Sequence, residues 1–147
     1  MRRVISRGIL LTAIVLVSLF TLPAFAQKAP DAFTQEVLIK STLITFNDAN
    51  ITGNYAVLHA KLSKLFRDKF SPDQLKAAFK GFHDNKIDFD IIVAKPPVPR
   101  QPARVNDNGV LLLYGHFDTT PRQMHYELEY MLSDGEWKPS RILVQFK

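Results

Sequence analysis

The amino-acid sequence predicts an α+β fold, in which three N-terminal helices pack on a curved, mostly antiparallel sheet of four to five strands. Two observations carry this prediction. Apolar residues recur every three or four positions from residue 31 to about residue 85, as they do on one face of a helix. Beyond residue 86 they alternate with polar residues, which is typical of strands with one buried face.

The first 26 residues have the three parts of a cleavable secretory signal peptide. Three arginines precede residue 8, an apolar run covers residues 9–22, and Ala24 and Ala26 supply small residues at the cleavage site. The run is shorter than the roughly 20 residues that span a bilayer. We therefore expect cleavage after Ala26, a periplasmic or secreted location, and a single domain over residues 27–147. Ordinary and twin-arginine export both stay open.

Loss of the signal changes the charge balance. The whole chain has 19 basic and 14 acidic residues, a net charge of +5, and three basic residues leave with the signal, so the exported part carries +2. Such a balance indicates no nucleic-acid partner. The chain has no cysteine, which excludes disulfides and a lipid anchor on cysteine. We expect no membrane anchor after cleavage and stability from packing alone.

Three helices are expected in the first half of the exported chain. The first covers residues 31–50, with Asp31 as its N-cap and apolar positions spaced by three and four. After a break at Gly53, the second runs from Tyr55 to Phe66. The third starts at Ser71-Pro72-Asp73-Gln74, where serine caps, proline takes the first helical position and glutamine completes a capping box. Some of their basic residues are expected on solvated faces, with an acidic surface or anionic lipid headgroups as the alternative partner: Lys61, Lys64, Arg67, Lys76, Lys80 and His83.

Strands are expected over residues 87–93, 103–105, 110–118, 123–132 and 137–146. The four prolines between Lys95 and Pro102 predict an extended edge or crossing segment, because proline cannot donate to a sheet ladder. Turns are expected at residues 106–109 and 119–122, and a two-residue hairpin turn at Asp134-Gly135.

Turn positions fix which residues face one another across the strands. A tip at Thr120-Pro121 places Phe117 opposite Met124 and Gly115 opposite Tyr126, on an apolar inner face. Tyr130 and Leu132 continue that face. The Asp134-Gly135 turn alone would send Pro139 and Arg141 inward, so we predict a β-bulge near Pro139 and Ser140 that turns Ile142, Val144 and Phe146 to the core. Without the bulge, Arg141 would be a buried cation in the cone, and binding of an anionic ligand would be the leading functional hypothesis.

The order of elements resembles the NTF2-like (cystatin-like) superfamily, in particular exported bacterial members of unknown function. The residues that carry the resemblance are Gly53 between the first two helices, the turn from Gly115 to Pro121 and the turn from Asp134 to Lys138. It covers essentially the whole exported chain. The resemblance implies a cone-shaped half-barrel whose mouth admits a small apolar ligand, and a sheet whose outer face often pairs two subunits.

Five aromatic residues are the candidates for lining such a pocket: Tyr55, Phe117, Tyr126, Tyr130 and Trp137. The alternative is that they pack in the core with their polar atoms bonded at its rim. Val110, Leu112 and Tyr114 form an apolar row on the outer face and are candidates for a homodimer interface. The alternative is that the proline-rich segment or the N-terminus covers that row.

The same register brings His116 opposite His125 on the outer face, with Asp118 and Glu127 nearby. We interpret them as polar neighbours rather than a metal site, because a solvent-facing sheet does not by itself fix ligand geometry. We expect neither a metal nor another cofactor.

No motif for covalent, phosphoryl or metallopeptidase chemistry occurs. Enzymes of the superfamily place an Asp, alone or with a Tyr, inside the cone, whereas the expected inner face here carries tyrosines and no carboxylate. We therefore predict a non-catalytic binding or interaction module with a small apolar pocket. The alternative is a proton-transfer isomerase or hydrolase-like enzyme that uses a cone tyrosine and a carboxylate, for which Asp48 is the candidate.

Overall fold

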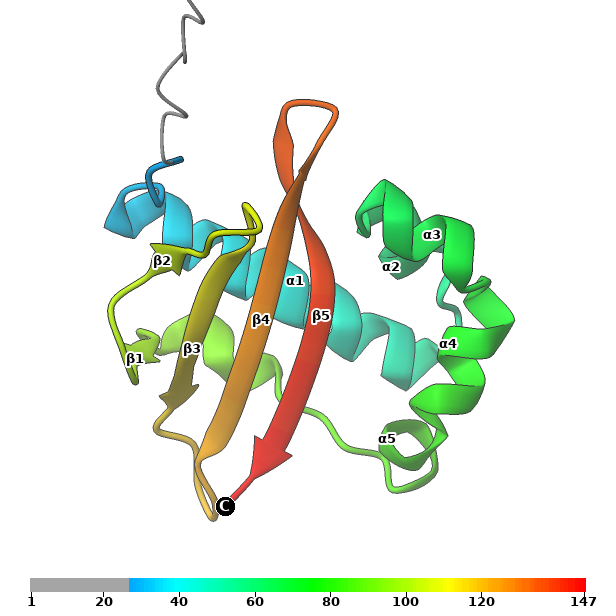
Figure 1. Cartoon of the computed structure of the whole chain (residues 1–147). Coiled ribbons are helices and arrows are strands. Elements are labelled where there is room, and N and C mark those ends of the chain that lie inside the picture. The colour runs from blue at the N-terminus through cyan, green and yellow to red at the C-terminus, as the bar shows by residue number, and fades with distance from the viewer. Residues whose placement is uncertain (1–26) are drawn as a thin grey trace, which may run out of the picture.

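The computed structural model describes residues 27–147, and the expected signal peptide lies outside the described residues. The chain forms an α+β fold (Figure 1). The helices are α1 (Ala32–Thr52), α2 (Ala56–Lys61), α3 (Lys64–Lys69), α4 (Pro72–Ala78), α5 (Lys80–Asp84) and the 3-10 helix η1 (Asp90–Ala94). The strands are β1 (Val98–Pro99), β2 (Arg104–Val105), β3 (Leu111–Phe117), β4 (Met124–Ser133) and β5 (Glu136–Phe146).

Helix α1 crosses one face of the sheet (Figure 1) and contributes much of the core. It begins as predicted, because the Asp31 carboxylate accepts a hydrogen bond from the Thr34 amide at 2.7 Å. It ends at Gly53, whose left-handed backbone (φ 69°) closes the helix. Its buried face includes Leu43 and Phe46, whereas Phe33, an apolar residue in its first turn, is 77% exposed. The first turn of α1 therefore lies outside the core.

The second and third predicted helices are each broken in two. Between α2 and α3, the Ser63 amide donates to the Pro139 carbonyl of β5 at 2.8 Å instead of to its own helix. Helix α4 has the predicted capping box, in which Ser71 and Gln74 bond to each other's backbone amides. It stops at Phe79, where the backbone leaves helical geometry before α5. The prediction of three helices is therefore too simple for residues 55–84.

The strand predicted over residues 87–93 is wrong. This segment is a loop followed by η1, and it pairs with no strand within residues 27–147. The Phe89 amide donates instead to Asn47 Oδ1 of α1 at 3.1 Å, and the Ile92 amide donates to the Phe89 carbonyl at 3.1 Å. The residues buried here are Phe89 and Ile92, three positions apart, whereas Ile91 and Val93 of the alternating pattern are exposed, so the alternation does not mark a sheet face.

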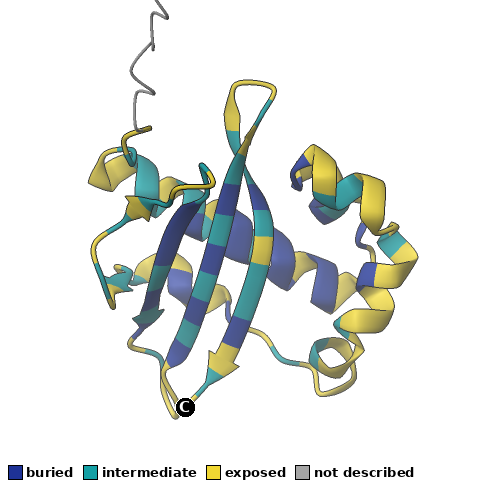
Figure 2. Cartoon of the chain, in the orientation of Figure 1, coloured by how far each residue is buried: buried dark blue, intermediate teal, exposed yellow. Residues whose placement is uncertain are grey.

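The sheet is open and antiparallel, in the order β1-β3-β4-β5, with β2 also pairing with β3. The predicted register of β3 and β4 is confirmed, including Phe117 opposite Met124 and Gly115 opposite Tyr126. Buried and half-buried residues alternate along β4 (Figure 2). Leu132 is an exception to the predicted inner face, since it is exposed near the hairpin tip.

The predicted bulge in β5 is also confirmed. Tyr130 pairs with Pro139 but Glu129 pairs with Arg141, so Ser140 is the extra residue. The shift places Val144 opposite Tyr126 and Phe146 opposite Met124, on the core side. Arg141 is consequently exposed on the outer face, which removes the idea of an anionic ligand bound by a buried Arg141.

Gly115 is required where β1 meets β3. A Cβ atom at this position would lie 2.3 Å from the Val98 carbonyl oxygen and 2.5 Å from the Tyr126 hydroxyl. Only glycine lets the proline-rich strand β1 approach β3 while Tyr126 fills the space beneath.

Candidate functional site

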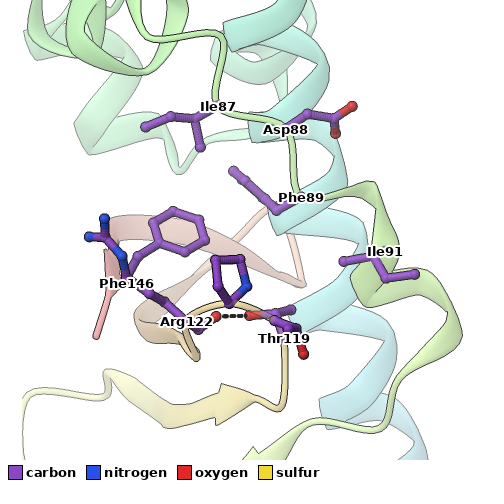
Figure 3. Close-up of a pocket in the computed structure, with 9 residues that line it drawn as sticks. Ile87, Asp88, Phe89, Ile91, Thr119, Arg122 and Phe146 are labelled. Atoms are coloured by element: carbon purple, nitrogen blue, oxygen red, sulfur yellow. Dashed lines mark hydrogen bonds between the residues drawn. The ribbon is translucent and has the colours of Figure 1, made fainter.

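A pocket of about 310 Å³ opens at the end of the sheet that holds the β3–β4 turn (Figure 3). We call it the end pocket. Three segments far apart in the sequence build it: the loop from α5 into η1, the turn at residues 119–122, and the end of β5. Its lining residues are Ile87, Asp88, Phe89, Ile91, Thr119, Thr120, Pro121, Arg122 and Phe146.

The buried amide of Asn47 positions the wall that comes from the helical half. Its Nδ2 donates to Asp88 Oδ1 at 3.0 Å and to Asp90 Oδ1 at 2.6 Å, and its Oδ1 accepts from the Phe89 amide. Asn47 is fully buried, so these bonds attach the segment 88–90 directly to the core. Phe89 is thereby turned inward, and Ile87 and Ile91 line the pocket on either side of it.

Apolar side chains dominate the end pocket, and its two charged residues differ in their surroundings. Asp88 accepts hydrogen bonds from the Asp90 amide and from Asn47, which together hold the pKa of its carboxyl below the usual value. The carboxylate points away from the pocket in Figure 3. Arg122, at the opposite rim, has no carboxylate within 4.0 Å among residues 27–147.

The five aromatic residues predicted to line one pocket are divided among three places. Phe117 and Tyr126 pack against each other in the core, with ring centroids 5.5 Å apart. Tyr55 is buried under α1 and donates to the Asn50 side chain. None of these three lines the end pocket.

Tyr130 and Trp137 do come together, in a second hollow of about 270 Å³ between α1, α2 and the base of the β4–β5 hairpin. We call it the hairpin pocket. It is more polar than the end pocket, since the Tyr130 hydroxyl lies 2.9 Å from the Leu38 carbonyl and 3.0 Å from Thr42 Oγ1. Lys61 reaches across it to donate to Thr45 Oγ1 at 2.9 Å.

Where the structure is described, from residue 27 on, no buried tyrosine is paired with a carboxylate. Burial raises the pKa of both Tyr126 and Tyr130, which keeps their hydroxyls protonated. The tyrosine that does contact a carboxylate is Tyr114, whose hydroxyl donates to Glu129 at 2.8 Å on the outer face of the sheet. Asp48, the candidate catalytic acid, is exposed on α1.

The outer face carries the predicted histidine pair. His116 and His125 stack with ring centroids 5.4 Å apart, and His116 Nε2 lies 3.2 Å from Asp118 Oδ1. Glu127 turns instead to Arg100 and Arg141. Over residues 27–147, no group of three potential ligand side chains is arranged to hold a metal ion.

The apolar row on the outer face is largely covered by its own chain. Leu112 is only 6% exposed, and Arg100, from the proline-rich segment, lies over the Tyr114 ring with its guanidinium carbon 5.3 Å from the centroid. Val110 is half-buried. A homodimer through Val110, Leu112 and Tyr114 stays a prediction.

No protein-family model matches this chain, and the searches of curated proteins and of solved structures find no match either. Among the helices that the structure describes, none has the length and apolar character needed to cross a bilayer.

The sequence pattern does not reveal the end pocket. It predicts a strand for Ile87, Phe89 and Ile91 and only a turn for Arg122. The available signal is Asn47, which follows Ile39 and Leu43 at four-residue spacing on the apolar face of the first predicted helix, where an asparagine needs polar partners from another segment.

Proposed function

We propose that the exported form of this chain is a non-catalytic binding protein that holds a small, mainly apolar molecule in the end pocket. The observation that carries the proposal is the pocket itself. Its volume of about 310 Å³ is within the range of small-molecule sites, and Ile87, Phe89, Ile91 and Phe146 supply apolar walls. Burial of an apolar ligand there would be favourable at about 25 cal/mol per Å² of surface removed from water.

Binding is favoured over proton transfer by the chemistry around the pockets. A general acid or base needs a pKa brought near the working pH, and hydrogen bonds move the pKa of Asp88 the opposite way. The phenols of Tyr126 and Tyr130 have no carboxylate partner among the described residues. An isomerase or hydrolase that uses a tyrosine with a carboxylate is therefore the weaker candidate.

We also propose that the fold is an NTF2-like half-cone. A long helix across one face of an open antiparallel sheet and the bulge in β5 support this proposal. The short helices α2 to α5, in place of two longer ones, depart from it.

Export remains part of the proposal. Cleavage after Ala26 would leave Gln27 as the first residue. An intact mass of protein from the periplasmic fraction checks this, and a full-length chain with Met1 found in the cytosol would contradict it.

A homodimer through the outer face is a further part of the proposal. Val110 is the most suitable position to test, because it is half-buried and lies outside the core. If the face pairs two copies, sedimentation velocity detects a dimer that Val110→Asp converts to a monomer. A wild-type protein that stays monomeric at high concentration contradicts the dimer and leaves the pocket proposal intact.

Fluorescence of N-phenylnaphthylamine, an uncharged apolar probe, tests the binding proposal. Ile91→Asp places a charge in the pocket wall, and Val93→Asp is the matched control, since both residues are exposed on η1 (57% and 62%) but only Ile91 lines the pocket. We expect Ile91→Asp to abolish probe binding and Val93→Asp to preserve it. Equal effects of the two substitutions, or no probe binding by the wild type, would overturn the proposal.

A further inference from the structure

We propose that the ligand of the end pocket is an amphiphilic carboxylate, whose apolar body lies against Phe89 and Phe146 and whose acid group binds Arg122. This inference rests on the proposed function, because it names the chemical class of the molecule in that pocket. Four observations on the pocket rim carry it.

Within the described part of the chain, Arg122 is a cation without an acidic partner. Its guanidinium extends along the rim to the side of the pocket where Phe146 lies (Figure 3). Two arginines beside β4 contrast with it: Arg100 pairs with Glu127 at 2.9 Å, and Arg141 pairs with Glu129 at 3.0 Å. A guanidinium presents several donors in one plane and suits a carboxylate in two-point contact.

The acidic residue that shares the pocket with Arg122 is turned elsewhere. Asn47 Nδ2 and the Asp90 amide both donate to Asp88 Oδ1, each at 3.0 Å. Figure 3 shows the Asp88 side chain directed away from the hollow. Asn47 Nδ2 also donates to Asp90 Oδ1, at 2.6 Å. The carboxylates of Asp88 and Asp90 are therefore occupied by Asn47 of α1 and by backbone within their own segment. Neither of them neutralises the charge of the Arg122 guanidinium at the rim.

The backbone that carries Arg122 is fixed on both sides. The Thr119 hydroxyl donates to the Arg122 carbonyl at 2.5 Å, a bond drawn in Figure 3. The next residue, Gln123, exchanges two backbone hydrogen bonds with Lys147, both 3.0 Å long. A guanidinium mounted on a fixed turn loses less freedom on binding than one on a mobile loop.

The apolar floor and the charged rim lie on different segments of the pocket. Phe89 is 1% exposed and forms part of the core, whereas Arg122 is exposed at the opening. A ligand with an apolar chain and an acid at one end can satisfy both at once. A fully apolar ligand would leave the guanidinium to water, and a small hydrophilic anion would leave the apolar floor unused.

Titration calorimetry of the mature protein with three probes that share an eight-carbon chain tests the inference: octanoate, octanol and octyltrimethylammonium. We expect octanoate to bind about fivefold more tightly than octanol, as one charge-assisted contact at a solvent-exposed rim would give. The cationic probe should bind most weakly. Lengthening octanoate by one methylene should strengthen binding by up to about fourfold.

Arg122→Gln should remove the preference for octanoate over octanol, and Arg122→Lys should retain part of it. Arg104→Gln is the matched control, because Arg104 is also exposed and without a salt bridge within residues 27–147, but lies on β2 outside the pocket. It should change nothing.

The outcomes separate this inference from the proposed function. If octanol and octanoate bind equally and Arg122→Gln has no effect, the carboxylate inference fails and the apolar pocket stands. If none of the probes binds, the proposed function itself fails. If Arg104→Gln weakens octanoate as much as Arg122→Gln does, the preference comes from overall charge and the assignment to Arg122 is overturned.

Discussion

The sheet and the short helices of residues 55–94 hold their shape by different means. On the face of β3 and β4 that α1 covers, every second residue is buried. The register of each strand is fixed by pairing with its neighbour. Residues 55–94 also contribute to the core, through Leu58, Leu75 and Phe89, but α3 and α5 have no fully buried residue, and hydrogen bonds at Ser63 and Asn47 position this region against β5 and α1. Substitutions in the sheet should therefore act on the whole fold, and substitutions in α3, α5 and the segment 88–90 should act more locally.

Replacing one glycine by alanine in each region should give the largest difference in unfolding free energy. Gly115→Ala would place a methyl group 2.3 Å from the Val98 carbonyl oxygen, so we expect a loss of about 3 kcal/mol in unfolding free energy. Gly81→Ala in α5 meets no atom within 4 Å and should stabilise the protein by up to about 1 kcal/mol. Urea unfolding measures both, and similar values for the two variants would contradict the comparison.

Asn47→Ala tests the attachment of the segment 88–90. The substitution removes three hydrogen bonds and leaves the buried Phe89 amide unpaired, for which we expect a loss of about 2 kcal/mol. Hydrogen exchange should accelerate over residues 87–94 well before it does in β4. Asn85→Ala, at an exposed asparagine that bonds the Gly81 carbonyl, is the control and should have a small effect. Uniform acceleration across the sheet would show that the attachment is not local.

Ser71→Ala should cost about 1 kcal/mol, because it removes the capping box of α4. Ser71→Asp should retain most of the stability, since aspartate also accepts from the Gln74 amide. Exchange rates of the first amides of α4 distinguish the two variants. If Ser71→Asp is as unstable as Ser71→Ala, the cap is not what starts this helix.

The stability of the fold should also depend weakly on pH, through a histidine of the sheet. Burial, with Lys147 and His116 nearby, lowers the pKa of His125 in the folded protein. The unfolded chain then binds a proton more readily, so stability should be complete above about pH 6.5 and should decrease as the pH falls below that value. Melting temperatures at pH 7.5 and 5.5 should differ less for His125→Gln than for the wild type. An unchanged difference would assign the dependence to other groups.

The hairpins could be predicted from the sequence because their constraints reinforce one another. A turn at residues 120–121 fixes every pairing along β3 and β4, and the poor fit of an inward Arg141 requires the bulge at Ser140. In the helical region, no comparable constraint in the sequence fixes where each helix ends. The break at Ser63 depends on a contact with Pro139, which is 76 positions away in the sequence.

The candidate site was less predictable than the fold. Tyr130 and Trp137 do line a hollow, but Tyr55, Phe117 and Tyr126 pack in the core or beneath α1. Large apolar side chains on an inner face pack against the helices that cover a sheet. Their sequence pattern therefore does not distinguish a residue that lines a pocket from one that packs in the core. The end pocket needs three distant segments to meet, and the hydrogen bonds of Asn47 help to hold one of them, the segment 88–90, against α1.

The tip of the β4–β5 hairpin extends beyond the other strands in Figure 1. Leu132, on its flank, is 46% exposed and lies outside both pockets. It is also at the far end of β4 from the turn that carries Arg122, a separation of roughly 26 Å at the usual rise of a strand. Because the chain has no cysteine, a thiol introduced by Leu132→Cys would be unique. A fluorophore on that thiol would report tumbling, and hence self-association, without disturbing the ligand.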